Sequence, residues 1–301
     1  MSNEPRVDAP VPTAHVRRRD AARTRRRRTG RTGRNPVAVV VLLLFAVFFG
    51  LPVLWLLLAA TKTEYQLVNA KPLSFGSWHT LQANWDALTR YQDGTVFLWL
   101  RNSAVYSFAA LAITLTVSIP VGYALARTDF PGRRTLLVST LVVMLMPSTT
   151  LVVPLFLEVN AVHLIGTIWS IILPFSFYPF GVYLAYIYFD TAVPGSLLEA
   201  ARLDGCTEFG AFRRVVLPLA MPVVALVGFF SFVTNWTTYF LPYVLLPQST
   251  QFPIQVGLTS MSIARPELAL ATLLATTPVV TVFLFSQRFL VTGMLAGSVK
   301  D

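Results

Sequence analysis

The stretch that decides the fold lies between two long apolar runs, at residues 190–214. It reads Asp-Thr-Ala-Val-Pro-Gly-Ser-Leu-Leu-Glu-Ala-Ala-Arg-Leu-Asp-Gly-Cys-Thr-Glu-Phe-Gly-Ala-Phe-Arg-Arg. The uncharged runs on either side, 164–189 and 215–264, are each long enough for a membrane-spanning helix, which needs about 20 mostly apolar residues. A charged segment between two such runs predicts a loop at a membrane surface, and this loop has helix signals of its own.

A short helix is predicted inside this loop. Ser196 and Glu199 have the S-x-x-E spacing of a capping box, in which each side chain bonds the other residue's backbone N–H, and this predicts a helix start at Ser196. Gly205 stands where a glycine commonly ends a helix. Thr207 is expected to cap a second short helix. The first helix carries small and leucine side chains, so it either docks onto a partner or packs on its own spans, and the residues alone leave both open.

Composition places most of the chain in a bilayer. Of 301 residues, 54% are hydrophobic and 13% charged, whereas soluble domains carry about 25% charged residues. We expect an all-α integral membrane protein with six transmembrane helices and a cytoplasmic helix in the loop. The predicted spans are 37–60, 102–126, 135–157, 165–189, 215–236 and 268–288. Residues 237–267 read as a polar loop. The chain has one cysteine and three scattered histidines, so neither an intrachain disulfide nor a metal site is expected, and no cofactor is predicted.

The net charge of +10 is concentrated in a tail. Residues 1–35 hold 11 Arg against three acidic residues, and the rest of the chain carries only +2. The sequence therefore predicts a disordered Arg-rich tail over 1–35 near lipid head groups, not a nucleic-acid site, and a six-helix transmembrane domain over 36–301 with its loop at 190–218. With both termini in the cytoplasm, inside segments hold 19 basic residues and outside segments five. This count predicts a multi-pass plasma-membrane protein with both termini inside. The 21 Arg against three Lys indicate a bacterial genome rich in G and C.

The loop resembles the EAA loop of ABC-importer permeases. That pattern is E-A-A, three residues, G, nine residues and then I-x-L-P; here only the Ile is replaced, by Val215. In the family this loop forms a coupling helix that inserts into a cleft on a separate ATPase subunit. The resemblance implies an ATPase-coupling site, with Glu199 serving both capping and docking. The implied site residues are Glu199, Ala200, Ala201, Asp204, Gly205, Leu217 and Pro218.

Further motifs are similar to the carbohydrate-uptake, MalG-like branch. They include Tyr-Ala-Leu-Ala-Arg at 123–127, Phe-Pro-Gly-Arg at 130–133 and Met-Pro at 146–147. The resemblance covers residues 36–301. It implies a heterodimer with a second permease subunit, two ATP-binding ATPase subunits and an extracytoplasmic sugar-binding protein. The family often has Trp-Asn-Asp/Glu-Phe after the fifth span, whereas this chain has Trp-Thr-Thr-Tyr at 236–239, so substrate contacts there can differ.

The residues also limit the mechanism. No G-x-x-x-x-G-K-[ST] phosphate loop is present, so the chain is not expected to be an enzyme, and another chain must hydrolyse ATP. No charged residue lies near a predicted span centre, which argues against an ion-driven carrier and fits an uncharged, hydroxyl-rich solute. Candidate pathway residues near the outer end of the fifth span are Asn235, Trp236, Thr237 and Tyr239. Alternatively, Trp236 and Tyr239 are membrane-interface aromatics.

Two other functions stay open. The chain could be an ABC permease for a different small solute, although the absence of acidic pathway residues counts against polycations. It could also be a membrane channel or scaffold that works without ATP. The second alternative predicts that no ATPase associates with the chain, whereas the sugar-importer interpretation predicts a stable ATPase partner at residues 190–218.

Overall fold

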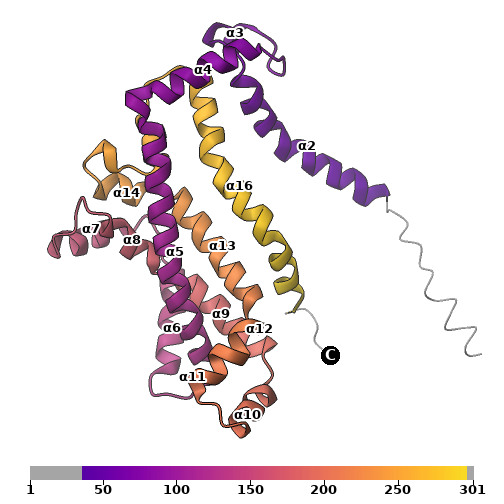
Figure 1. The fold of residues 1–301 in the computed structure, drawn as a ribbon, viewed down its shortest axis with the longest axis vertical. Coiled ribbons are helices and arrows are strands. Elements are labelled where there is room, and N and C mark those ends of the chain that lie inside the picture. Colours follow the sequence, from indigo (N-terminus) through magenta and orange to yellow (C-terminus); the bar gives the residue numbers. More distant parts are fainter. Residues whose placement is uncertain (1–35, 297–301) are drawn as a thin grey trace, which may run out of the picture. The chain divides into compact units, whose positions relative to one another are not determined.

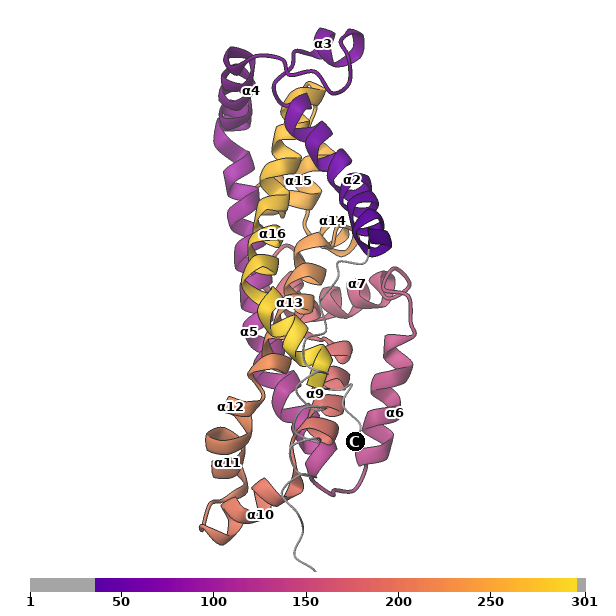
Figure 2. The same cartoon turned by 90° about the vertical axis from the view of Figure 1, so that its right-hand side faces the viewer.

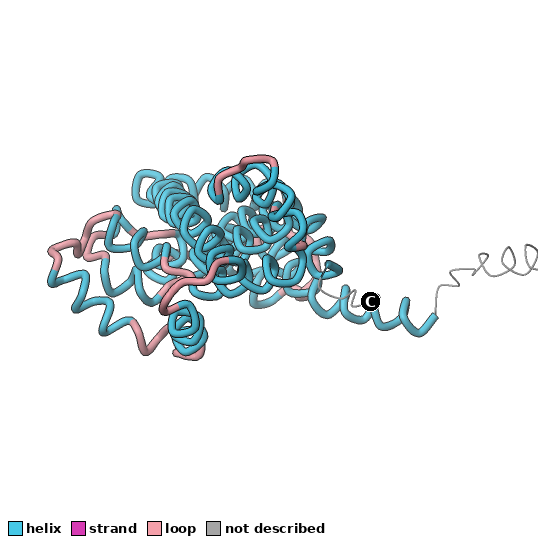
Figure 3. The backbone as a smooth tube through the Cα atoms, turned by 90° about the horizontal axis from the view of Figure 1, so that it is seen from below, coloured by secondary structure: helices cyan, strands magenta, loops and turns pink. Residues whose placement is uncertain are grey.

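A computed structural model describes the backbone of residues 36–296 and the side chains of residues 36–289. The tail predicted over 1–35 and the last residues, 297–301, lie outside the described residues. Within the described part the backbone forms helices and loops and no strand (Figure 3). The chain divides into two compact units, 1–53 and 54–301, and α2 (Pro36–Ala59) crosses the boundary.

Unit 54–301 contains the other elements. In chain order they are α3 (Glu64–Asn69), α4 (Trp78–Arg90), η1 (Tyr91–Gly94), α5 (Thr95–Arg127), α6 (Arg133–Met144), α7 (Val152–Ala161), α8 (Trp169–Ser176), α9 (Pro179–Ala192), α10 (Gly195–Leu203), α11 (Glu208–Ala211), the π-helical η2 (Phe212–Val216), α12 (Leu217–Leu219), α13 (Met221–Thr237), α14 (Phe240–Leu245), η3 (Ser249–Gln251), α15 (Ile254–Ser260) and α16 (Arg265–Ala296). Helix α5 is the central element and packs against α8, α9 and α13. Helices α3 and α4 lie at one end of this unit and α10 and α11 at the other (Figures 1 and 2).

Four of the described helical segments are long and apolar enough to cross a membrane. They are Pro36–Ala59, Trp78–Arg127, Trp169–Ala192 and Arg265–Phe289. A fifth is possible if Glu208–Leu219 and Met221–Thr237, which meet at a bend of 76°, form one span. The all-helical, multi-span architecture matches the sequence prediction, whereas the count of six spans stays a prediction.

The prediction of one continuous helix over 135–157 is wrong. The chain forms α6 and α7 with a break at residues 145–151. The break centres on Pro147, which has no backbone N–H to donate and sterically opposes a helix running through it. The neighbouring Met146 N–H turns to the Val143 carbonyl at 3.1 Å, and Thr150 N–H bonds the Pro147 carbonyl at 3.0 Å. Two short helices joined by turns therefore replace the expected span.

The helix predicted over 165–189 is also interrupted. Helix α8 ends at Ser176 and α9 begins at Pro179, with Phe177 and Tyr178 in non-helical conformations between them. A proline disfavours helical geometry at the preceding residue, so Tyr178 cannot continue α8, while Pro179 itself suits the first turn of α9. Breaks in two neighbouring segments leave helix ends in the middle of the unit.

Residues 240–264, which read as part of a polar loop, fold back along α5. One face of α5 binds this segment through side chains: Trp99 Nε1 donates to the Ser249 carbonyl at 2.8 Å, and Tyr106 OH donates to the Gln251 carbonyl at 2.9 Å. Asn102 Nδ2 donates to the carbonyls of Thr250 at 2.8 Å and Phe252 at 3.1 Å. The segment 249–254 is thus fixed to α5 by directional hydrogen bonds.

The start of α15 lies equally close to α5. Ser103 Oγ accepts a hydrogen bond from Ile254 N–H at 2.8 Å. A Cβ added at Gly257 would lie 2.1 Å from Cε3 of Trp99, so only a glycine allows this approach of α15 to the indole ring.

Candidate functional site

Helix α10 begins two residues earlier than a cap at Ser196 predicts. Its N-cap is Pro194, with φ −64° and ψ 137°, and no side chain caps the helix. The capping box between Ser196 and Glu199 is therefore wrong, because Ser196 already lies inside the first turn. Leu197 N–H bonds the Pro194 carbonyl at 3.2 Å instead. As a consequence Glu199 has no capping role and its exposed carboxylate is available to a partner.

The end of α10 is as predicted. Gly205 has φ +79°, the left-handed conformation that favours glycine. Its N–H bonds the Arg202 carbonyl at 3.0 Å, and Cys206 N–H bonds the Ala201 carbonyl at 3.0 Å. These two bonds form a Schellman motif, which satisfies carbonyls at the helix end. Asp204, the C-cap, donates its N–H to the Ala200 carbonyl at 3.0 Å.

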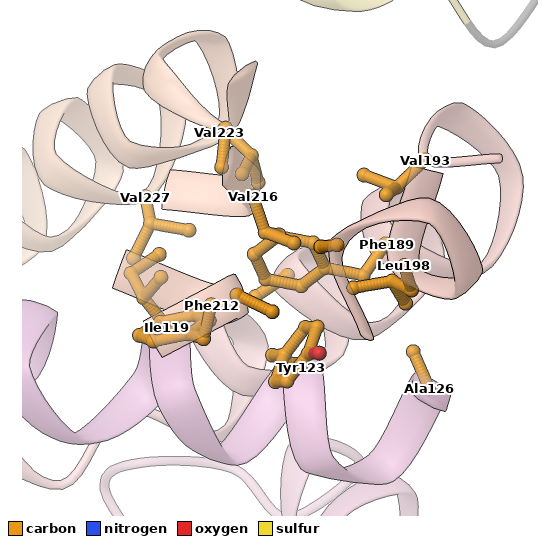
Figure 4. Packing of buried hydrophobic residues seen from close by; sticks show 14 residues of the cluster. Ile119, Tyr123, Ala126, Phe189, Val193, Leu198, Phe212, Val216, Val223 and Val227 are labelled. Carbon is orange, nitrogen blue, oxygen red and sulfur yellow. The ribbon is translucent and has the colours of Figure 1, made fainter. Parts of the chain in front are cut away.

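One face of α10 packs on the chain's own helices. Leu198 and Ala201 are 5% and 6% exposed and belong to an apolar cluster with residues of α5, α9, η2 and α13 (Figure 4). Tyr123 is the centre of this cluster, with ring centroids 5.5 Å from Phe189 and 4.8 Å from Phe212. The other buried members are Ile119, Ala126, Ala185, Val193, Ala211, Val216, Ala220, Val223 and Val227.

The opposite face of α10 is exposed. Five of its residues are accessible in this chain: Leu197, Glu199, Ala200, Leu203 and Asp204. Leu203 is 88% exposed. These five residues, together with Phe209 of α11, are called here the α10 face. Phe209, 72% exposed, was missed by sequence reasoning because a single aromatic in a four-residue helix gives no periodic signal.

The loop after α10 leads back into the helical bundle. Thr207 caps α11 as predicted, accepting the N–H of Gly210 at 3.1 Å. Arg202 Nε donates to Glu208 Oε1 at 2.7 Å, and this ion pair lowers the pKa of Glu208 and raises that of Arg202. Leu217 packs partly buried against the cluster around Tyr123, whereas Pro218 is exposed in α12.

The guanidinium group of Arg127 binds backbone carbonyls at the same end of the unit. Arg127, the last residue of α5, donates from Nε to the Phe189 carbonyl at 2.9 Å and from Nη2 to the same oxygen at 2.6 Å. Nη2 also donates to the carbonyls of Asp190, at 3.2 Å, and of Val193. These carbonyls lie where α9 ends and the loop to α10 begins. A positive charge at a helix C-terminus is favourable, so Arg127 fixes the base of α10.

A cavity of about 1000 Å³ lies elsewhere in the same unit. It is lined by the two helix breaks, at 145–151 and 177–178, and by the end of α13 and the start of α14. Asn235, a predicted pathway residue, is among its lining residues and is 6% exposed, and its Nδ2 has no hydrogen-bond partner in the described structure.

The other three predicted pathway residues are not among those that line the cavity. Trp236 is buried, and its Nε1 donates to the Ala275 carbonyl of α16 at 2.9 Å. The indole therefore packs inside the unit, against α16. Thr237 is exposed and bonds the Val233 carbonyl of its own helix at 2.8 Å. Tyr239 stacks on Tyr243 with ring centroids 5.4 Å apart.

The cavity also contains a residue that sequence reasoning missed. Glu158, on α7, is the one charged side chain among the lining residues. A continuous helix over 135–157 would end just before Glu158. Because the chain instead breaks between α6 and α7, Glu158 lies within α7, which lines the cavity. The Met-Pro step at 146–147 is the signal that could have indicated this break.

Comparison with known proteins now gives the family. Residues 118–295 match the family model "Binding-protein-dependent transport system inner membrane component". The chain is 29% identical over 271 residues to the arabinooligosaccharides transport system permease protein AraQ of Bacillus subtilis (strain 168), covering 86% of this chain and 93% of that one. It is 31% identical over 280 residues to the polygalacturonan/rhamnogalacturonan transport system permease protein YtcP of the same organism, covering 86% and 95%.

A solved structure shares the fold. A chain from a bacterial ABC transporter involved in the import of the acidic polysaccharide alginate matches with a TM-score of 0.74 at 20% identity, covering 94% of this chain and all of that one. The resemblance to carbohydrate-uptake ABC permeases is thus confirmed. This chain belongs to the family of binding-protein-dependent transport system inner membrane components, and it is a multi-pass membrane subunit of the ABC-transporter permease class.

Proposed function

We propose that this chain is one permease subunit of an ATP-driven importer and that the α10 face is its docking site for a separate ATPase. One observation carries the proposal. Helix α10 is held on one side by the buried Leu198 and Ala201 and presents Glu199, Ala200 and Leu203 on the other. An exposed apolar patch with a polar rim is typical of a partner site.

The connection from α10 to the spans supports a coupling role. Any displacement of α10 acts on Tyr123 and Phe212, because Leu198 packs in the same cluster. The chain then runs through η2 and α12 to the bend of 76° before α13. A π-helical turn followed by a sharp bend is a place where a helix can change direction between two packings. ATPase closure would thereby move α13 through contacts inside this chain.

The membrane arrangement follows from the same proposal. Segments α6 and α7 together supply the sixth span, and the basic loops at 127–134 and 190–214 face the cytoplasm with both termini. Residues 1–35 form a cytoplasmic tail attached to the permease domain 36–301. A second permease subunit, two ATPase subunits and an extracytoplasmic binding protein complete the importer, in which the loop 190–218 contacts an ATPase.

The cargo we propose is a sugar or oligosaccharide delivered by that binding protein. The relatives are named for arabinooligosaccharides and for polygalacturonan/rhamnogalacturonan. The cavity of about 1000 Å³ between the helix breaks is large enough for an oligosaccharide segment, and pockets of about 300–1000 Å³ hold small ligands in general. Broken helices around a central cavity are also the architecture that transporters use for substrate sites.

Copurification and uptake test the docking site. The full chain is tagged and extracted from its native membrane, and the associated proteins are identified by mass spectrometry. We expect an ATPase with the wild type and its loss with Glu199→Lys, together with loss of uptake of labelled oligosaccharide. Asp129→Lys is the matched control, because Asp129 is exposed on the other basic loop and its ion pair with Arg133 is at the surface. No ATPase with the wild type, or equal loss with both variants, would refute the proposal.

A further inference from the structure

The cavity combines apolar walls with a single charge. Most of its lining side chains are apolar, from Val143 and Met146 at the first helix break to Phe177 and Phe180 at the second. Glu158 is its one charged lining residue, it is exposed, and it forms none of the ion pairs found among the described residues. Glu158 therefore determines the sign of the charge among the residues that line this cavity.

A second polar group lines the cavity without a partner. Asn235 is 6% exposed, and its Nδ2 is buried with no hydrogen-bond acceptor in the described structure. A buried donor without an acceptor costs about 1–3 kcal/mol, so such a group in a transport cavity points to a ligand that supplies an oxygen. The amide donates and the carboxylate accepts, and a sugar hydroxyl can satisfy either group.

The relatives do not settle the charge of the cargo. One is named for arabinooligosaccharides and another for polygalacturonan, and the structural neighbour serves an acidic polysaccharide. Two like charges about 4 Å apart repel by about 1 kcal/mol in bulk water and by about 4 kcal/mol near a protein surface. A uronate entering beside Glu158 would meet this repulsion, whereas a hydroxyl would gain an acceptor.

We propose that Glu158 makes this cavity select neutral or amino sugars and reject sugars that carry a carboxylate, sulfate or phosphate. The proposal rests on the importer function and names the class of its cargo. Glu158 acts here as a specificity residue, accepting hydroxyl or ammonium protons, and Asn235 is the neutral donor of the same cavity. Selection by charge then takes place in the membrane subunit, separately from any selection by a binding protein.

The test compares two probes that differ in charge and in the methyl groups of the ester. Digalacturonate and its methyl ester are titrated into the full chain with its copurified membrane partners in nanodiscs, without binding protein, and binding is followed by microscale thermophoresis. We expect the ester to bind the wild type at least about tenfold more tightly than the acid. Glu158→Gln should bring the two affinities to within about twofold, and Glu158→Asp should restore the preference.

Two further variants keep the proposal falsifiable. Asp86→Asn removes one exposed carboxylate of α4, outside the cavity lining, and should leave the preference unchanged. Asn235→Leu should weaken ester binding about tenfold, the loss of one hydrogen bond. Failure of the ester to bind the wild type, tighter binding of the acid, an unchanged ratio in Glu158→Gln, or unchanged ester binding in Asn235→Leu would overturn the proposal. ATPase copurification does not depend on Glu158, so these failures leave the docking proposal intact.

Discussion

Two regions of unit 54–301 are held in place by different kinds of interaction. At the α10 end, the loop helix rests on an apolar cluster around Tyr123, with Arg127 fixing the chain where α9 ends. Along the N-terminal half of α5, the segment 249–254 is held by hydrogen bonds between α5 side chains and successive backbone groups of the segment. Burial holds α10 itself, with the hydrogen bonds of Arg127 confined to the end of α9 and the loop before α10, whereas directional bonds hold the length of segment 249–254.

This difference has a mechanical meaning. Apolar contacts have no preferred direction, so a packed helix can be displaced together with its cluster and find a second arrangement. Hydrogen bonds between side chains and backbone groups fix the position of segment 249–254 along α5, because each donor must lie close to its acceptor and point toward it. We therefore expect movement at the α10 end and a fixed position for segment 249–254.

The largest effect is expected from the apolar cluster. Phe189 is fully buried beside Tyr123, so Phe189→Ala should lower the free energy of unfolding by about 3–5 kcal/mol. The matched control is Phe209→Ala, because Phe209 is 72% exposed and should change stability by less than about 0.5 kcal/mol. Denaturation in detergent micelles measures both. Equal losses would show that burial does not hold this end.

The next effect is expected from Arg127. Arg127→Met removes a charged donor from the carbonyls of Phe189, Asp190 and Val193, and should cost about 2–3 kcal/mol. Arg127→Lys keeps the charge but not the planar fork, so it should recover only part of this loss. The same denaturation series measures both variants. Full recovery with lysine would mean that charge alone, and not the geometry of the fork, matters.

A smaller effect is expected from the hydrogen bonds that hold segment 249–254. Asn102→Ala should cost about 1–2 kcal/mol and should speed amide hydrogen exchange over residues 249–256, because two carbonyls lose their donor. Exchange at α10 should not change. Asn69→Ala is the control, since Asn69 is exposed and bonds only a carbonyl of its own short helix. Faster exchange at α10 in Asn102→Ala would contradict the separation of the two regions.

The smallest effect is a pH dependence of the loop after α10. The pKa of Glu208 is lowered by its bond to Arg202, so the pair is fully present above the ordinary carboxyl pKa of about 4.3. Its contribution is lost as the pH falls through the lowered pKa of the folded state. The fraction of time that α11 is open, obtained from hydrogen exchange after division by the intrinsic rate at each pH, should therefore rise at acid pH in the wild type and show no such transition in Glu208→Gln. An identical profile in both would exclude the ion pair as the cause.

The sequence predicts those features that depend on neighbours along the chain. The glycine turn at Gly205, the cap at Thr207 and the long apolar course of α5 and α16 follow from local residue patterns. The capping box failed for a local reason too, because Pro194 starts the helix earlier. The EAA spacing predicts where α10 lies along the chain. It does not predict which of the two alanines is buried, because the burial of Ala201 and the exposure of Ala200 depend on the cluster around Tyr123.

Other features depend on partners far apart in the chain. Trp99 and Ser249 are 150 residues apart, and no local pattern indicates that one donates to the other. Asn235 was predicted in a pathway because it is polar near a span end, whereas Glu158 was overlooked because a continuous span was assumed over 135–157. Proline at 147 breaks that span, and only the folded chain places both residues on one cavity.

The most direct test of the account compares two neighbouring alanines of α10. Ala200→Arg adds a long charged side chain to the exposed face, and Ala201→Arg adds the same side chain to the buried one. We predict that Ala200→Arg keeps wild-type stability within about 0.5 kcal/mol but no longer copurifies with an ATPase, whereas Ala201→Arg destabilises the chain itself. Retention of the ATPase by Ala200→Arg at the wild-type ratio would contradict the claim that the exposed face of α10 is the docking site.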